Sequence, residues 1–239
     1  MRTVVWTRPV EDWAYDQRFV KADGPVLHFP LTQQVSCQPE IPSKPCEFVI
    51  ITSRKAAETF LKCAAPQREL WQKAEFVTFG METYKYLLGQ NIRTRLIQAP
   101  SAKEFCEILL SELKKGTVLW FPRPLETAFP LSEQLRAHGL EVHDFVLYRT
   151  EPLKVYDPLA IQKLIAEPAV VCFASPSAVK AFVDVIRTHD EARFYKYVPV
   201  AIGHTTLSSG QSYFNESFVA AQSTLQSLWE RALDVSKSL

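Results

Sequence analysis

Short apolar runs alternate with segments of helical periodicity through most of the chain. Runs that read as buried strands lie at 4–6, 48–51, 76–79, 94–97 and 118–121. The intervening stretch 101–115 repeats apolar residues at helical spacing, with Ser101 and Glu104 forming a capping-box start and Gly116 a stop. Strands that alternate with helices in this way predict parallel sheets covered by helices on both faces.

The same pattern resumes after two breaks, which predicts how the chain divides into domains. Three prolines between positions 39 and 45 interrupt regular structure, and a fresh helix and strand begin after Pro158. The last third of the chain lacks a first strand for its sheet. Residues 3–7 are strand-like and not used elsewhere, so they could supply that strand. We therefore expect a discontinuous α/β domain of residues 1–28 plus 153–239.

The remaining segments complete that division. Residues 36–146 would form a second α/β domain inserted into the first. The segments 29–35 and 147–152 would connect the two domains.

The chain also contains a weak copy of itself. The segments 49–60 and 171–182 each read as an apolar strand, a serine, an alanine three residues later and a phenylalanine four beyond that. A second element of the form V-x-x-G-x-x-T follows at 77–83 and again at 200–206. The serine precedes the glycine by 27 residues in the first copy and by 28 in the second. Agreement in type, order and spacing predicts two similar units that face each other with a ligand between them.

Composition and charge narrow the class of partner. With 239 residues, 47% apolar and 22% charged, the chain is typical of a soluble globular protein. Its net charge of +1 gives no general attraction to nucleic acid or to an anionic membrane, so an anionic ligand must be met by locally placed arginines and lysines. The five cysteines form no C-x-x-C pair, which favours reduced thiols and a cytoplasmic location.

Several familiar signals are absent from the sequence. It has no G-x-G-x-x-G, no phosphate-binding loop with lysine and no G-x-S-x-G elbow. The five histidines show no metal-ligand spacing, and no apolar run is long enough for a signal peptide or a membrane span. A nucleotide-cofactor site, a metal site and a serine nucleophile are therefore not expected.

The candidate chemistry lies at the turns that follow the strands. Ser53, Ser175, Ser177, Gly80 and Gly203 each end a strand and open a helix. The unpaired N–H groups of a helix's first turn favour a carboxylate or phosphate, and parallel sheets bind ligands at this edge. Ordinary helix capping explains any single turn equally well. Several such turns in duplicate favour anion binding.

Tyr148 ends a strand at the proposed crossing between the domains. It could be a half-buried aromatic residue of the sheet. It could also face the ligand and donate a proton or a hydrogen bond.

Taken together, these residues resemble the uroporphyrinogen-III synthase family. The matching pieces are Thr7-Arg8-Pro9, Thr52-Ser53-Arg54, Gly80-Met81-Glu82-Thr83, Val146-Leu147-Tyr148-Arg149-Thr150, Phe173-Ala174-Ser175-Pro176-Ser177-Ala178, Ala201-Ile202-Gly203-His204-Thr205-Thr206 and Ser223-Thr224-Leu225. The chain departs from the family pattern at His204, at Gln222 and at Phe121-Pro122-Arg123-Pro124, which bears on loop shape and substrate contacts more than on fold.

The resemblance implies two similar flavodoxin-like α/β domains with parallel sheets, joined by a two-stranded β connector. It implies a cofactor-free monomeric lyase that closes hydroxymethylbilane to uroporphyrinogen III with inversion of ring D. Tyr148 corresponds to the family's proposed proton donor. The implied substrate-binding residues are Arg8, Thr52, Ser53, Arg54, Gly80, Thr83, Ser175, Ser177, Gly203, Thr205 and Thr206.

Two other interpretations compete with this one. A non-catalytic cytoplasmic binding protein for a small polyanion would use the same turns. A tetrapyrrole methyltransferase is disfavoured because the chain has no glycine-rich cofactor loop.

Overall fold

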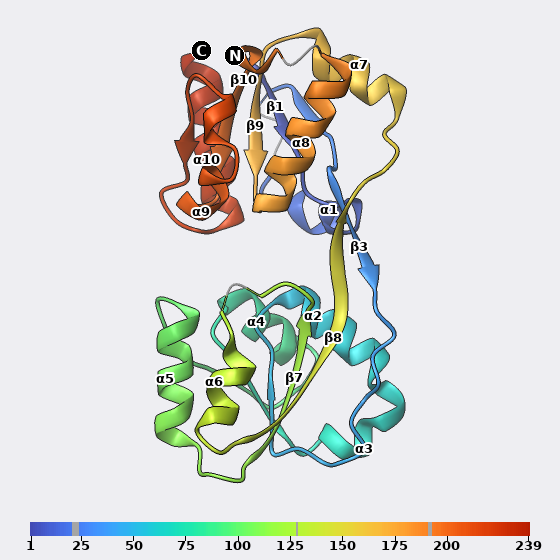
Figure 1. The fold of residues 1–239 in the computed structure, drawn as a ribbon, viewed down its shortest axis with the longest axis vertical. Helices are drawn as coiled ribbons and strands as arrows, with labels where there is room; N and C mark the ends of the chain where they lie inside the picture. The colour runs from blue at the N-terminus through green and yellow to red at the C-terminus, as the bar shows by residue number, and fades with distance from the viewer. Residues whose placement is uncertain (21–23, 128, 191–192) are drawn as a thin grey trace. The chain divides into compact units, whose positions relative to one another are not determined.

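The computed structural model describes residues 1–20, 24–127, 129–190 and 193–239, and it divides into two compact units. Unit 1 consists of Met1–Gln34 and Thr150–Leu239, and unit 2 consists of Val35–Arg149. Each unit contains a mainly parallel β-sheet with helices packed on it (Figure 1). The fold class expected from the alternating pattern is therefore confirmed.

Unit 1 contains a sheet in the order β11-β10-β9-β1-β2, in which every neighbouring pair is parallel. Its strands are β1 (Thr3–Trp6), β2 (Val26–His28), β9 (Ala169–Phe173), β10 (Tyr197–Ala201) and β11 (Phe218–Val219). Its helices are α1 (Val10–Asp16), α7 (Pro158–Ala166), α8 (Pro176–His189), α9 (His204–Ser208) and α10 (Leu225–Ser238), with short 3-10 turns at Phe194–Lys196 and Gln211–Tyr213. Numbered along this unit, the order is 2-1-3-4-5, which is the flavodoxin-like arrangement.

Both faces of this sheet are buried, as its apolar strands require. Along β9 the side chains alternate, so that Val171 and Phe173 join the core under α7 and α8, while Val170 and Cys172 join the core under α10. Burial is complete enough that the pKa of the Cys172 thiol is raised well above its ordinary value. The N-terminus runs beside α10, since the Arg2 amide donates to the Ser236 carbonyl at 3.0 Å (Figure 1).

Unit 2 contains a sheet in the order β3-β8-β7-β4-β5-β6. Its strands are β3 (Thr32–Ser36), β4 (Phe48–Ile50), β5 (Glu75–Thr78), β6 (Thr94–Leu96), β7 (Val118–Pro124) and β8 (Glu141–Pro152). Its helices are α2 (Arg54–Cys63), α3 (Arg68–Trp71), α4 (Met81–Gly89), α5 (Ala102–Glu112) and α6 (Leu131–Ala137), with a 3-10 turn at Ala65–Gln67. Helices α2, α3 and α4 cover one core, and α5 and α6 cover the other.

The two sheets are circular permutations of one another. The sequence copies align β4 with β9, so that Val49 corresponds to Val171, and they align β5 with β10. Val49 pairs with Trp120 of β7, and Val171 pairs with Val5 of β1, so β7 corresponds to β1 and β8 to β2. The order of β4 to β8 in unit 2 is then the same as that of the five strands of unit 1, although unit 2 enters it at β4 and unit 1 enters it at β1; the edge strand β3 has no counterpart in unit 1.

Strands β3 and β8 also carry the chain from one unit to the other. Strand β3 begins in unit 1 and ends in unit 2, and β8 runs the opposite way along the sequence. They are hydrogen-bonded neighbours, and the Cys37 amide donates to the Leu147 carbonyl at 2.9 Å. The proposed connector 147–152 lies within β8, and the proposed connector 29–35 begins before β3 and overlaps it.

Local sequence signals account for several element ends. Ser101 caps α5 by accepting the Lys103 amide at 3.2 Å. Gly139 follows α6 with a φ of 85°, a conformation that favours glycine after a helix. Strand β7 extends three residues beyond the apolar run, through Pro124, and strands β2 and β11 were not expected from the pattern.

Candidate functional site

The carboxyl edge of the unit 1 sheet gathers several of the predicted residues around one small hollow. Its volume is about 120 Å³, and its lining includes Thr7, Arg8, Thr32, Gln34, Thr150 and Ser175. Thr7 fixes one side of it, because its hydroxyl donates to the Cys172 carbonyl at 2.6 Å and ties the end of β1 to β9. Arg8 and Ser175, both predicted from the sequence to bind substrate, line this same hollow, whereas Thr32, Gln34 and Thr150 beside them were not predicted.

Arg8 is held at this edge by two carboxylates of α1. Its Nε donates to Asp16 Oδ2 at 2.9 Å, and its Nη2 donates to Asp12 Oδ2 at 2.8 Å. Asp16 is fully buried and also accepts the Trp6 indole N–H at 2.8 Å. Burial raises the pKa of Asp16 above its ordinary value, and the nearby Arg8 charge only partly offsets this effect. If the Arg8 guanidinium moved away, the buried Asp16 carboxylate would be left without its charged partner, which is unfavourable. The two carboxylates therefore orient the guanidinium.

The serines of the duplicated turns cap their helices. Ser53 Oγ accepts the Ala56 amide at 3.1 Å, and Ser175 Oγ accepts the Ala178 amide at 3.3 Å. Ser177 Oγ lies 2.9 Å from Ser175 Oγ. Capping, one of the two interpretations left open by the sequence, is therefore satisfied in both copies, and it leaves the remaining first-turn N–H groups at the strand edge.

The glycine turns have the same design in the two units. Gly80 precedes α4 and Gly203 precedes α9, each in an extended conformation. Thr83 and Thr206 are buried behind them, and a Cβ on Gly80 would lie 3.3 Å from Thr83 Oγ1. The Thr83 side chain therefore packs close against the Gly80 turn, Thr206 is buried after Gly203, and Thr205 is exposed.

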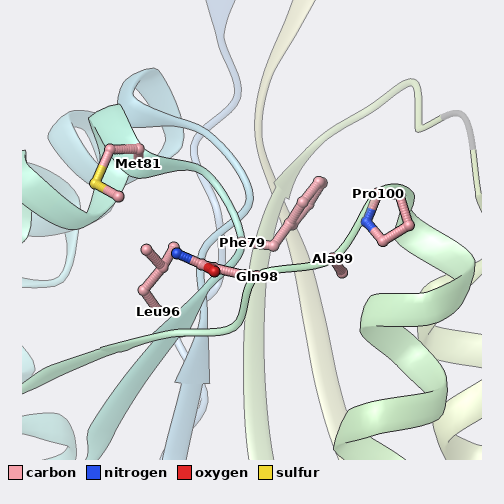
Figure 2. A pocket seen from close by; sticks show the side chains of 6 residues that line it. All are labelled: Phe79, Met81, Leu96, Gln98, Ala99 and Pro100. Atoms are coloured by element: carbon pink, nitrogen blue, oxygen red, sulfur yellow. The ribbon is translucent and has the colours of Figure 1, made fainter.

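A larger apolar hollow of about 440 Å³ adjoins the Gly80 turn in unit 2 (Figure 2). It is lined by Phe79, Met81, Leu96, Gln98, Ala99 and Pro100. The Phe79 ring also rests on Phe105, with centroids 5.0 Å apart. Sequence reasoning missed this surface because its residues come from two separate strand-to-helix turns, after β5 and after β6. It offers flat apolar area with one amide for hydrogen bonding.

Tyr148 lies within β8, beside the last residue of β7 and on the face of the sheet that α2 covers. The expectation that it ends a strand is wrong, because β8 continues to Pro152. A β-bulge sets this orientation: Arg123 pairs with Val146, but Pro124 pairs with Tyr148, so Leu147 is an extra residue. Without the bulge, alternation would send Tyr148 to the other face from Phe145 and Leu147; with it, all three belong to one core cluster. Bulges re-aim side chains in this way, frequently beside active sites. The ring is mostly buried, with 8% of the residue exposed.

The predicted arginine of the first copy has a local partner. Arg54 Nε donates to Glu58 Oε1 at 2.8 Å, one helical turn along α2, and its guanidinium lies 5.2 Å from the Tyr86 ring centroid. Thr52 and Ser53 precede it at the end of β4. Arg54 is half-buried at the same edge of the sheet where Gly80 follows β5.

Neither a metal cluster nor a membrane span is found in the described parts of the chain. No group of three or more histidine, cysteine or acidic side chains there is arranged to hold a metal ion. None of the helices described there has the length and apolar character needed to cross a bilayer.

Comparisons with known proteins agree with this architecture. In solved structures, the chain is similar to uroporphyrinogen-III synthetase from Helicobacter pylori, with a TM-score of 0.72 and 22% identity, over 98% of this chain and 100% of that one. It is also similar to a mutant uroporphyrinogen III synthase from the extremely thermophilic bacterium Thermus thermophilus, with a TM-score of 0.56 and 15% identity, over 98% and 100% of the two chains. A comparison with curated protein sequences found no match.

The sequence itself matches the family described as uroporphyrinogen-III synthase HemD across residues 14–230, which is most of its length. This match supports the family interpretation of the sequence, and the solved structures share its two-unit fold. The chain belongs to the uroporphyrinogen-III synthase family.

Proposed function

We propose that Tyr148 is the proton donor in the reaction of this family, which closes hydroxymethylbilane to uroporphyrinogen III with inversion of ring D. The linear substrate loses its terminal hydroxyl, which leaves as water if an acid supplies a proton, and a cationic azafulvene electrophile remains. A phenol is protonated at neutral pH and can provide that proton. The β-bulge that turns Tyr148 onto the α2 side of its sheet edge is the observation that carries this assignment.

The substrate's carboxylates would be bound by the helix-opening turns at the two sheet edges. In unit 1 these are the turns at Ser175, Ser177 and Gly203, with Thr205 and Thr206. Arg8 adds a fixed guanidinium beside the 120 Å³ hollow.

In unit 2 the corresponding turns are Thr52-Ser53 and Gly80, with Thr83 and Arg54. Free first-turn amides favour carboxylates, and capping by the serines preserves the geometry that presents them.

The apolar hollow beside Gly80 would receive a pyrrole ring. Phe79, Met81 and Leu96 supply the flat surface, and Gln98 supplies a polar group (Figure 2). Spontaneous closure of the substrate gives the uninverted isomer, so the protein must hold the chain bent until the substituted carbon of ring D reaches the electrophile. That task requires positioning more than strong acid–base chemistry.

We propose the domain organisation given above, with 1–28 plus 153–239 and 36–146 as domains and 29–35 and 147–152 as connectors. We also propose that the protein is a cytoplasmic monomer. All five cysteines are described and free, which fits a reducing compartment. Light scattering of the purified chain should give a mass near 27.2 kDa, and a dimer mass would contradict the monomer.

The isomer of the product tests the reaction directly. Hydroxymethylbilane would be generated enzymatically in the presence of this protein, the products oxidised, and isomers I and III separated by chromatography. We expect isomer III to dominate. Isomer I alone would mean that this chain binds at most, without catalysing the inversion.

A further inference from the structure

We propose that Arg123 and Asp144 are positioning residues that hold the β-bulge from which Tyr148 projects, a proposal that rests on the proton-donor role proposed for Tyr148. Neither residue was predicted from the sequence as part of the site. Both lie in unit 2, on the adjacent strands β7 and β8.

Residues on both sides of the bulge are joined by hydrogen bonds. On β8, Asp144 precedes the extra residue Leu147, and Tyr148 follows it. On β7, Arg123 precedes the register shift, and Leu125 follows the end of the strand. Leu147 still accepts the Cys37 amide of β3 at 2.9 Å, but the bulge leaves it without a partner on β7, so contacts before and after it help to fix the local conformation on that side.

The side chain of Arg123 contacts residues on both sides of the bulge. Its Nε donates to Asp144 Oδ2 at 2.9 Å, and its Nη1 donates to the carbonyl of Pro124 at 3.1 Å and of Leu125 at 3.0 Å. The Leu125 amide in turn donates to the Tyr148 carbonyl at 2.9 Å. The chain Asp144–Arg123–Leu125–Tyr148 therefore connects the strand before the bulge to the backbone of the tyrosine after it.

The charges of Asp144, Arg123 and Arg136 favour these hydrogen bonds at neutral pH. Burial of Asp144 tends to raise its pKa, but hydrogen bonds from Arg136 and Arg123 outweigh that effect and hold the pKa below its ordinary value. Arg136 is itself anchored on the Val142 carbonyl, at 2.8 Å from Nη2. Asp144 stays ionised, so it can orient the Arg123 fork through a charge-assisted bond.

The test is a double-mutant cycle in the isomer assay, using the full chain. Arg123→Gln is expected to lower kcat at least about tenfold with little change in KM. If Arg123 acts through Tyr148, Arg123→Gln/Tyr148→Phe should be no slower than Tyr148→Phe alone. Ordinary loss of an ion pair would lower the melting temperature in either background, but it would not produce this coupling in kcat.

Two further variants keep the test decisive. Asp144→Asn preserves shape while weakening the hold on Arg123, and it should show the same coupling to Tyr148→Phe if Arg123→Gln folds poorly. Arg95→Gln is the matched control, because Arg95 is a half-buried arginine of the same unit that pairs with Glu112 at 2.6 Å. Its kcat should match that of the unsubstituted protein.

The outcomes separate this proposal from the one it rests on. A normal kcat for Arg123→Gln, or losses that multiply in the double variant, would overturn the positioning role and leave Tyr148 as the donor. A normal kcat for Tyr148→Phe would overturn both.

Discussion

Units 1 and 2 share a strand order but hold their edge arginines in different ways. Through the aligned strands β1 and β7, Arg8 corresponds to Arg123, and each is followed by a proline. Arg8 is gripped by carboxylates of the following helix, whereas Arg123 is gripped by Asp144 of the neighbouring strand. At the position that corresponds to Asp144, unit 1 has His28, whose Nε2 donates to the Arg8 carbonyl at 2.9 Å.

This difference shows how one scaffold can serve two tasks. In unit 1 the arginine is presented at the rim of a polar hollow beside Ser175, which suits binding of an anion. In unit 2 the arginine is directed at the backbone of a bulge, which suits the orientation of Tyr148. In the proposed function, the duplicated turns of both units bind anions, and the proton donor lies in unit 2.

The strongest effects should come from the phenylalanines that the two copies share. Phe60 is fully buried among Trp71, Phe76 and Phe145, and Phe182 is equally buried in unit 1. Replacing either with alanine removes a large core side chain and leaves a cavity, so Phe60→Ala and Phe182→Ala should each cost about 3–5 kcal/mol in unfolding free energy. Urea denaturation measures this. A loss below about 1 kcal/mol in one unit only would show that the copies are not structurally equivalent.

Asp144 holds Arg123 and Asp16 holds Arg8, and the contributions of these two carboxylates to folding stability should change in opposite directions as the pH falls. The folded-state pKa of Asp144 is lowered, so its contribution to stability is present above its unfolded pKa near 3.8 and is lost as pH falls through the folded value. Asp144→Asn should therefore cost about 1–3 kcal/mol at pH 7, and the deficit should shrink below about pH 4.

Asp16 has the opposite sign. Its folded-state pKa is raised by burial, so the stability it contributes is fully present below 3.8 and is lost as pH rises through the folded value. The deficit of Asp16→Asn should accordingly grow as the solution is acidified. Denaturation curves of both variants between pH 7 and pH 3 compare these trends, and parallel trends would contradict the assigned environments.

Smaller effects should follow removal of the capping hydroxyls. Ser53→Ala and Ser175→Ala each lose one cap bond, which costs about 1 kcal/mol. Ser111→Ala, on the exposed side of α5, serves as a control that should be neutral. If the serines also contact substrate, KM will rise with each substitution; unchanged KM would limit them to capping and leave binding to the backbone amides.

Much of this comparison could be predicted from the sequence, because apolar periodicity and the duplicated turns are local signals. The central strands β4, β5, β9 and β10 follow directly from them. Strands β2 and β11 are only three and two residues long, too short for a pattern to appear. Their place is decided by pairing with β1 and β10 rather than by composition.

The candidate site was harder to predict from the sequence, because it also depends on strand pairing rather than on a local pattern. The bulge at Leu147 exists only in the pairing of β7 with β8, so the orientation of Tyr148 could not be read from alternation. Arg123 looked like part of a variable loop because its partner Asp144 lies 21 residues away. Arg8 and Ser175, by contrast, could be proposed from the sequence because each follows a strand with a strong apolar signal.

The most direct measurement of the central claim is kcat for Tyr148→Phe in the isomer assay, beside Tyr197→Phe. The second variant removes a buried hydroxyl in unit 1 that donates to Asp190 at 3.1 Å, so it should lose stability but keep its kcat. Loss of a general acid should lower kcat of Tyr148→Phe by about a hundredfold or more, with stability nearly unchanged. A Tyr148→Phe protein that forms isomer III at the unsubstituted rate would contradict the account.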